Sequence, residues 1–394
     1  MSKVQLTTLT PVHIGSGNVL QNNIDFIQGV VKGYTYLGIL DHQKLMRIIG
    51  PNRVDSWVAA IERGEGMGDF LAKCSSKELT IENYSSRLLL CLYPLNMATN
   101  EPMRECVHDG LGRAYIPGSS LKGSIRTALL AFFVNKKNHD GNQTIDFKNK
   151  KRAAQKTESA LFGSDPNTDC FRFLQIGDVY FNNNCEEVYN MININERERK
   201  SFVDRSKHQL VEAIFDEEAS LEFNMRISQS AELSRMIDEY NRRVEIWNND
   251  PRNTRKKNLI KKFEISDLKT LFSIINSHTQ QILEQEVDIW NDYIEEDGVR
   301  DYLDAINDMI ESTSNCKSGE CVLRVGHASG WRFTTGAWTE DNLNDGNWDR
   351  LVDLARPMNR QKYDGMQFPK SRRVNYQKGH DMTLLGFVKL KIVE

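Results

Sequence analysis

Cations, hydroxyls and glycines are concentrated in residues 115–126, Tyr-Ile-Pro-Gly-Ser-Ser-Leu-Lys-Gly-Ser-Ile-Arg. The Pro117-Gly118 turn predicts a strand end followed by a helix start, and either following serine is placed to cap that helix. Lys122 and Arg126 are four residues apart, so they share a helix face beside the free N–H groups of the first turn. Such a face is suited to binding a phosphate. The candidate phosphate-binding residues are Ser119, Ser120, Lys122 and Arg126.

The residue order excludes a nucleotide-binding P-loop. That motif needs a glycine, four residues, a second glycine, and then Lys followed by Ser or Thr. Here Lys122 precedes Gly123, so ATP or GTP binding is rejected. Two interpretations remain: a phosphate-binding helix start, or a capped helix whose cations are simply solvated.

Two glycine-bearing stretches near the chain ends have similar chemistry: Leu9-Thr-Pro-Val-His-Ile-Gly-Ser-Gly17 and Arg324-Val-Gly-His-Ala-Ser-Gly-Trp-Arg332. Glycines let a backbone approach a ligand closely, and arginines with hydroxyls suit a sugar-phosphate backbone. Trp331 either stacks on a base or plugs the sheet behind its loop. The candidate RNA-contacting residues are His13, Gly15, Ser16, Gly17, Arg324, Gly326, His327, Ser329, Gly330, Trp331 and Arg332.

Charge is distributed unevenly along the 394 residues, although the net charge is only −3. Residues 113–156 hold ten Lys or Arg against two Asp, and residues 356–378 hold seven against one. Residues 284–311 hold eleven Asp or Glu against one Arg. This separation favours a protein that binds a polyanion on one side and something else on another. The seven scattered cysteines, and the lack of a long apolar run or a signal peptide, predict a cytoplasmic protein without a membrane span.

Hydrophobic spacing predicts a mixed chain. Helices are expected at 41–49 and 51–75, and strands at 3–9, 85–93, 172–181 and 382–393. Residues 186–310 are charged and poor in glycine, and helices are expected at 207–215, 229–248, 255–291 and 298–312.

The residues Ile116-Pro-Gly-Ser-Ser-Leu-Lys-Gly-Ser-Ile-Arg126 resemble the signature of the RAMP superfamily, the RNA-binding subunits of type III CRISPR effectors. Residues 9–17 and Phe173-Leu-Gln-Ile-Gly-Asp-Val-Tyr180 resemble it too. The resemblance implies an α+β fold with two ferredoxin-like (RRM-like) domains and helical insertions. The expected division is an N-terminal domain at 1–185 with a helical insertion near 41–80, a helical insertion or bundle at 186–312, and a C-terminal RAMP-like part at 313–394.

Within that superfamily the chain looks most like the subunits that cap the filament of the type III-A (Csm) complex. This implies a non-catalytic protein, without cofactor or metal, that binds the 3′ part of the CRISPR guide RNA (crRNA) and assists its 3′-end maturation. The implied partners are crRNA and possibly target RNA, the repeating backbone RAMP subunit, the small helical subunit and a host nuclease.

Two catalytic alternatives stay open. His13 could act as general acid or base of a metal-independent crRNA-processing endoribonuclease, or it could be a packed histidine at a strand end. No second histidine lies near it in sequence. Asp25 could cut target RNA, as an early acidic residue does in the backbone subunits, but the residues around it favour a turn.

Overall fold

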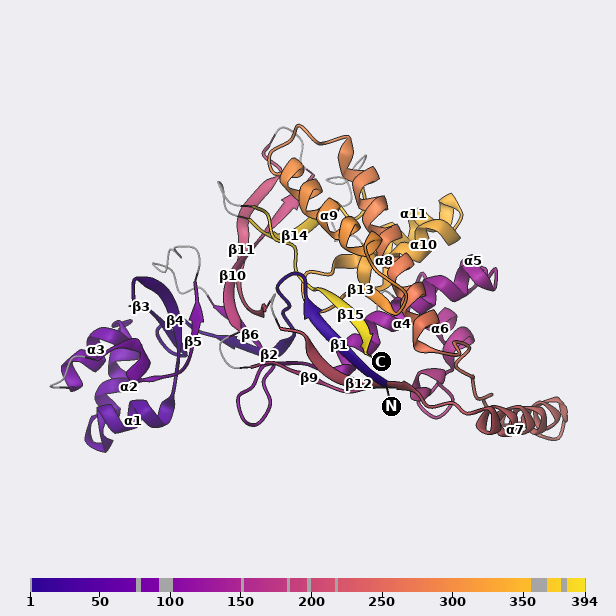
Figure 1. Ribbon diagram of the computed structural model, residues 1–394, viewed down its shortest axis with the longest axis horizontal. Helices are drawn as coiled ribbons and strands as arrows, with labels where there is room; N and C mark the ends of the chain where they lie inside the picture. Colours follow the sequence, from indigo (N-terminus) through magenta and orange to yellow (C-terminus); the bar gives the residue numbers. More distant parts are fainter. Residues whose placement is uncertain are drawn as a thin grey trace.

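The computed structural model describes residues 2–75, 79–91, 102–149, 152–182, 185–196, 200–216, 219–355, 367–376 and 381–393 (Figure 1). Part of each basic segment noted above, including Lys150, Lys151 and residues 356–366, lies outside the described residues. Helices and sheets are mixed along the rest of the chain, and the predicted α+β class is confirmed. Among the described residues, no helix has the length and apolar character needed to span a membrane.

A five-stranded antiparallel sheet joins the two ends of the chain, in the order β13-β15-β1-β12-β8. Its strands are β1 (Ser2–Thr8), β8 (Leu174–Ile176), β12 (Leu221–Ile227), β13 (Glu320–Arg324) and β15 (Phe387–Val393). Every second residue of β1 is buried, including Val4 and Leu6, so one face of the strand forms core. In Figure 1 the first and last strands lie side by side near both chain termini.

Two helices cover the buried face of this sheet: α4 (Gly118–Lys136) and α8 (Leu268–Asn291). Leu271, Phe272 and Ile275 recur at helical spacing on α8, and all three are fully buried in the same cluster as Val4. Along the chain, β1, α4, β8, β12, α8 and β15 follow the βαββαβ order of a ferredoxin-like unit, with β13 added beside β15.

A second, eight-stranded sheet has the order β2-β6-β11-β10-β5-β4-β3, with β14 paired to β10. Its strands are β2 (Gly15–Leu20), β3 (Phe26–Val31), β4 (Tyr34–Leu40), β5 (Ser85–Leu90), β6 (Met103–Cys106), β10 (Glu186–Asn195), β11 (Val203–Ile214) and β14 (Ser371–Asn375). The predicted helices near 41–75 are α1 (His42–Ile49), α2 (Val54–Glu62) and α3 (Met67–Cys74). They pack on the β3–β4 end, far from the five-stranded sheet (Figure 1).

The remaining elements are short or peripheral. They are β7 (Tyr115–Ile116) paired with β9 (Val179–Tyr180), helices α5 (Gly141–Thr144), α6 (Gln155–Phe162), α7 (Ala231–Asn249), α9 (Val299–Ser314), α10 (Ala337–Asn342) and α11 (Asp345–Ala355), and the turns η1 (Pro51–Arg53), η2 (Ile81–Asn83), η4 (Cys170–Phe173) and η5 (Arg332–Gly336).

The prediction that 186–312 is a helical insertion is wrong for residues 186–227, which form β10, β11 and β12. Leu210, Val211 and Ile214 have the spacing of a helix face, yet they lie on a strand that buries both of its faces. Helices α7, α8 and α9 follow from residue 231 onward. Sheet pairing also crosses the expected boundaries at 185 and 312, because β1 pairs with both β12 and β15.

The start of α4 differs from the expectation that Ser119 or Ser120 caps it. Pro117 is the N-cap residue and makes no side-chain cap. Instead, the amide of Gly118 donates to Oδ1 of Asp178 at 2.8 Å. A Cβ on Gly118 would lie 2.3 Å from the carbonyl oxygen of Ile176, so a glycine is required where the helix start meets the end of β8.

We expect Asp178→Ala to lower the free energy of unfolding by about 1 kcal/mol, because the first amide of α4 loses its acceptor. Ser119→Ala is the matched control and should change it by less than about 0.5 kcal/mol, since that exposed side chain makes no cap. Urea unfolding monitored by circular dichroism measures both. Equal effects of the two variants would contradict the assignment of the cap.

Candidate nucleic-acid interface

The two glycine-bearing stretches, which are more than three hundred positions apart in the sequence, contact each other directly. The N-terminal loop (residues 9–14) follows β1, and the C-terminal loop (residues 325–331) follows β13. The amide of His327 donates to the carbonyl oxygen of His13 at 2.9 Å. Gly326 has φ +77°, and a Cβ there would lie 2.4 Å from the same oxygen. Only glycine permits this approach.

The start of β15 holds both loops in place through backbone hydrogen bonds. The amide of Gly386 donates to Pro11 O at 2.8 Å, and its carbonyl oxygen accepts from the amide of Val325 at 2.7 Å. Leu9 and Thr10 donate to the carbonyl oxygen of the next residue, Phe387. Three strands of the five-stranded sheet therefore deliver the loops to one end of that sheet.

Helix α4 supplies the third wall of a groove. The hydroxyl of Thr127 donates to Thr334 O at 2.7 Å and joins the helix to the segment after the C-terminal loop. Gly123 has no atoms within 4 Å of an ideal Cβ position, so space is left beside the helix start. The cavity of about 420 Å³, which we call the loop groove, is lined by His13, Ile14, Gly15, Arg104, Ser120, Gly123, Ser124, Thr127, Gly326, His327, Ser329, Phe333 and Thr334.

The loop groove has the electrostatics of an anion site. None of its described lining residues is acidic, and its polar groups are hydroxyls, imidazoles and the exposed guanidinium of Arg104 on β6. Hydroxyls, backbone groups and arginine are the usual partners of nucleic-acid phosphates and sugars. The groove could accept a phosphate without burying a carboxylate beside it.

His13 is anchored from behind by an ionic network. Its Nδ1 donates to Glu212 O at 2.5 Å, which leaves Nε2 as the acceptor. The Glu212 carboxylate accepts two bonds from Arg87, at 2.9 and 3.1 Å, and one from the amide of Cys106 at 2.9 Å. Burial raises the pKa of the Glu212 carboxyl despite this ion pair. The backbone carbonyl of Glu212 thus fixes the His13 ring, while the carboxylate of the same residue is held by Arg87 and the Cys106 amide.

The structure brings a second histidine to His13, which sequence proximity could not reveal. The rings of His13 and His327 meet edge to face, with centroids 5.4 Å apart. Burial lowers the pKa of His13, and Arg104 adds to this effect. Burial, followed by the influence of His13, Arg373 and Arg104, lowers the pKa of His327 to about 4. Both imidazoles are therefore neutral at pH 7.

Lys122 and Arg126 line a different depression, of about 580 Å³, together with Glu158 and Asp169. The Arg126 guanidinium binds Glu158 at 3.0 Å and Asp169 at 2.8 Å, and it lies over the ring of Phe162. Burial lowers the pKa of Lys122. Phosphate binding at this face stays a prediction, and the two carboxylate partners of Arg126 favour a structural role for that side chain.

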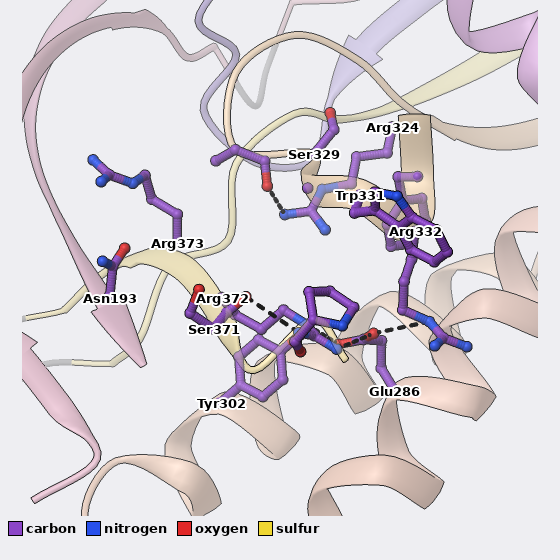
Figure 2. Close-up of a pocket in the computed structure, with 14 residues that line it drawn as sticks. Asn193, Glu286, Tyr302, Arg324, Ser329, Trp331, Arg332, Ser371, Arg372 and Arg373 are labelled. Carbon is purple, nitrogen blue, oxygen red and sulfur yellow. Dashed lines mark hydrogen bonds and ion pairs between the residues drawn. The ribbon is translucent and has the colours of Figure 1, made fainter. Parts of the chain in front are cut away.

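Other candidates divide between the surface and a neighbouring cavity. Ser16 and Gly17 lie on exposed β2, where the Ser16 hydroxyl donates to Glu105, and Ser119 is exposed on the first turn of α4. A cavity of about 550 Å³ behind the C-terminal loop, which we call the arginine pocket, contains Arg324, Ser329, Gly330, Trp331 and Arg332 among its lining residues (Figure 2).

Trp331 is held by aromatic packing. Its ring centroid lies 5.8 Å from that of Trp348 and 5.0 Å from that of Phe368. A Cβ on Gly336 would lie 2.1 Å from its indole, so that glycine makes room for the ring. These contacts favour the plug over the base-stacking interpretation.

Seven residues that line the loop groove are absent from the predicted candidates: Ile14, Arg104, Gly123, Ser124, Thr127, Phe333 and Thr334. Gly123, Ser124 and Thr127 belong to the same helix as Ser120, at spacings of three, four and seven, so they lie on one face with it. Arg104 carries no comparable signal, because it is one exposed residue of a short strand.

A possible cation site lies behind the groove. Among the described residues, Glu105, His108 and Glu212 form the one set of such groups close enough to share a metal ion. Arg87 binds both carboxylates, at 3.2 Å and 2.9 Å, and so occupies the position of a cation. We regard the cluster as an ion-pair network that supports His13.

The family of the chain follows from its sequence. A model of the RAMP superfamily matches residues 5–259, which is more than half of the chain. The chain therefore belongs to the RAMP superfamily. No protein with a curated description shows significant sequence similarity to it.

The whole chain superposes on solved structures. A chain of the cryo-EM structure of a Csm–crRNA–target RNA ternary complex from a type III-A CRISPR-Cas system superposes with a TM-score of 0.67 and 18% identity, covering 100% of both chains. The crystal structure of Csm5 from T. onnurineus gives a TM-score of 0.63 and 18% identity, covering 98% of this chain and 100% of that one. The fold is thus shared from end to end with these proteins.

We expect Gly326→Ala to destabilise the protein by about 3 kcal/mol or more, because its Cβ would clash with His13 O and separate the two loops. Gly330→Ala is the matched control. It has a similar φ of +71° but open space around its Cβ position, so it should cost only about 1 kcal/mol. Thermal and urea unfolding measure both, and similar losses would show that backbone strain alone, and not loop contact, requires Gly326.

Proposed function

We propose that this protein is a non-catalytic, RNA-binding subunit of a type III-A CRISPR (Csm) effector complex. In this proposal it caps the filament, holds the 3′ part of the crRNA and assists crRNA 3′-end maturation. The observation that carries the proposal is the loop groove, a cavity free of carboxylates among its described lining and walled by both glycine-bearing loops and α4.

The loop groove suits a single RNA strand that is held by its sugar-phosphate backbone. Its groups are Arg104, serine and threonine hydroxyls, and loop backbone at two glycines, and these groups contact sugar and phosphate without reading sequence. A guide that changes its sequence from one spacer to the next requires such recognition. Binding of this kind weakens with salt, because each neutralised phosphate releases counterions.

The two histidines argue for binding over cleavage. Acid–base cleavage of RNA needs one group that accepts a proton and one that donates a proton at working pH. His13 and His327 both have lowered pKa values, so neither is in the imidazolium form that serves as a general acid at pH 7. The neutral rings can instead accept hydrogen bonds, for which the free Nε2 of His13 is available.

The proposed protein partners are the repeating backbone RAMP subunit, the small helical subunit and a host nuclease. The similar chain in the cryo-EM structure comes from a complex that also contains crRNA and target RNA. The acidic segment 284–311, on the C-terminal part of α8 and on α9, gives this chain a surface of opposite charge to the groove. That separation supports RNA at one place and protein at another.

The second candidate is a metal-independent endoribonuclease, which the meeting of His13 and His327 favours. The backbone-subunit alternative has less support, since the Asp25 carboxylate accepts from the Gln21 amide at 2.7 Å and closes a turn. Incubation of the purified protein with repeat RNA separates these cases. We expect intact RNA with a mobility shift; cleavage abolished by His13→Ala, or metal-dependent cleavage abolished by Asp25→Asn, would contradict the proposal.

For binding itself, we expect Arg104→Gln to weaken affinity for single-stranded RNA by about 3- to 10-fold at low salt. The slope of log affinity against log salt should fall by about 0.7 for one lost phosphate contact. Arg252→Gln is the matched control, because Arg252 is an exposed arginine paired with Asp250 beyond α7. Fluorescence anisotropy at several salt concentrations measures both, and equal affinities would exclude Arg104 from the interface.

Lys122 and Arg126 need separate variants. Lys122→Ala tests phosphate binding at the helix start, and we expect it to weaken RNA binding in a salt-dependent, sequence-independent way. Arg126→Ala should instead lower the free energy of unfolding by about 1–3 kcal/mol, because Glu158 and Asp169 lose their shared partner. A loss of RNA affinity in folded Arg126→Ala without a loss of stability would reverse this division.

A further inference from the structure

The arginine pocket contains more positive charge than its own carboxylate can neutralise. Its described lining includes Arg324, Arg332, Arg372 and Arg373 but only one acidic residue, Glu286. Figure 2 shows the Arg324 guanidinium reaching into the space between the C-terminal loop and β14, with Arg373 on the opposite side of that space. The pocket therefore has the composition of a binding site for an anion.

Glu286 is fully engaged by other groups. Arg372 binds its two oxygens at 2.5 and 2.8 Å, and the Tyr302 hydroxyl donates to it at 2.7 Å. Arg332 Nε lies 3.2 Å from one of its oxygens and pairs with Glu340 through another nitrogen. These five residues form a closed structural network at the floor of the pocket, in which two arginines are balanced by two carboxylates. The positive charge available for a ligand must come from the other two arginines.

Arg324 is such a group. Its side chain is buried, and its hydrogen bonds go to backbone carbonyl oxygens, Leu385 O at 3.0 Å and Ala328 O at 3.1 Å. The rings of Phe333 and Phe387 flank the guanidinium at 4.8 and 4.7 Å. No ion pair joins it to a carboxylate within the described part of the chain. Burial lowers its pKa to about 10, and the nearby Tyr302 and Glu286 offset this effect only in part.

Arg373 supplies the second cation. It is partly exposed on β14, and its described side-chain bond is to the neutral Gln209 at 3.2 Å. Burial, with a contribution from Arg104, lowers its pKa. Because Arg104 lines the loop groove and Arg373 lines the arginine pocket, a charge in one cavity acts on a charge in the other.

The arginine pocket and the loop groove share a wall. Ser329 and Phe333 line both cavities. Arg104, from the groove, and Arg373, from the pocket, both contribute to the lowered pKa of His327. A chain of phosphates leaving the groove past Ser329 would meet positive charge without interruption.

We propose that the arginine pocket is a phosphate site in which Arg324 and Arg373 bind a phosphate group of the RNA strand that leaves the loop groove over Ser329. This inference rests on the proposed function for the source of the phosphate. Arg324 is held in place by two carbonyl oxygens and two rings, so it costs little further ordering when the phosphate binds. Arg373 comes from β14, on the other side of the pocket, and completes the site.

The experiment measures single-stranded RNA affinity by anisotropy across several salt concentrations for the wild-type protein, the Arg104→Gln variant described above and four further variants. We expect Arg373→Gln to bind about 3- to 10-fold more weakly at low salt, with a salt slope smaller by about 0.7. Arg373→Lys should keep the slope, because it keeps the charge. Asn193→Asp, which adds a negative charge to the pocket lining, should weaken binding in the same direction. Arg252→Gln should match the wild-type protein.

The same set decides between outcomes. Unchanged affinity and salt slope in both Arg373→Gln and Asn193→Asp, with unchanged melting temperature, would overturn the phosphate site. If only Arg104→Gln lost RNA affinity, the loop groove would still be supported as an RNA-binding site. If the wild-type protein binds no RNA but inorganic phosphate raises its melting temperature and fails to do so in Arg373→Gln, the pocket holds a phosphate from another source and the proposed function fails. If the wild-type protein bound neither inorganic phosphate nor RNA, both the phosphate site and the proposed function would be excluded.

Discussion

The structure depends on one close backbone contact, between the amide of His327 and the carbonyl oxygen of His13. This contact joins two loops from opposite ends of the chain, and it exists because Gly326 presents no Cβ to the oxygen. The five-stranded sheet makes it possible, since β15 lies between β1 and β13 and bonds to both loops where it begins. Without the sheet joining the termini there would be no groove.

The same contact determines what the groove can do chemically. It brings two imidazoles together, and burial with nearby arginines keeps both uncharged at neutral pH. The carboxylate of Glu212 is held in its ion pair with Arg87, and the same residue supports His13 through its backbone carbonyl. The result is a rigid surface of neutral hydrogen-bonding groups beside arginines, which favours holding a polyanion over cutting it.

Sequence reasoning predicted the local features and missed the long-range ones. The turn at Pro117-Gly118, the apolar stripe of α8 and both glycine-bearing loops carry clear local patterns. The contact between the loops could not be predicted from the sequence, because it is made by backbone atoms. The one sequence feature that accompanies it is a glycine, which does not identify its partner. Strands β10 and β11 bury residues on both faces, so they lack the alternation that marks a strand. Strand β12 does alternate, and the charged, glycine-poor composition around it favoured helices over that short signal. Likewise, the partners of Arg126 and Arg324 come from distant segments.

Photo-crosslinking tests the central claim, that the two loops and α4 form one RNA-binding groove, most directly. Single-stranded RNA carrying 4-thiouridine would be bound to the full-length protein, irradiated and mapped by mass spectrometry. The account predicts crosslinks within residues 12–17, 120–127 and 325–334, all three reduced together by Gly326→Ala in protein that remains folded. Crosslinks confined to α1–α3 or to α7, with none at either loop, would contradict it.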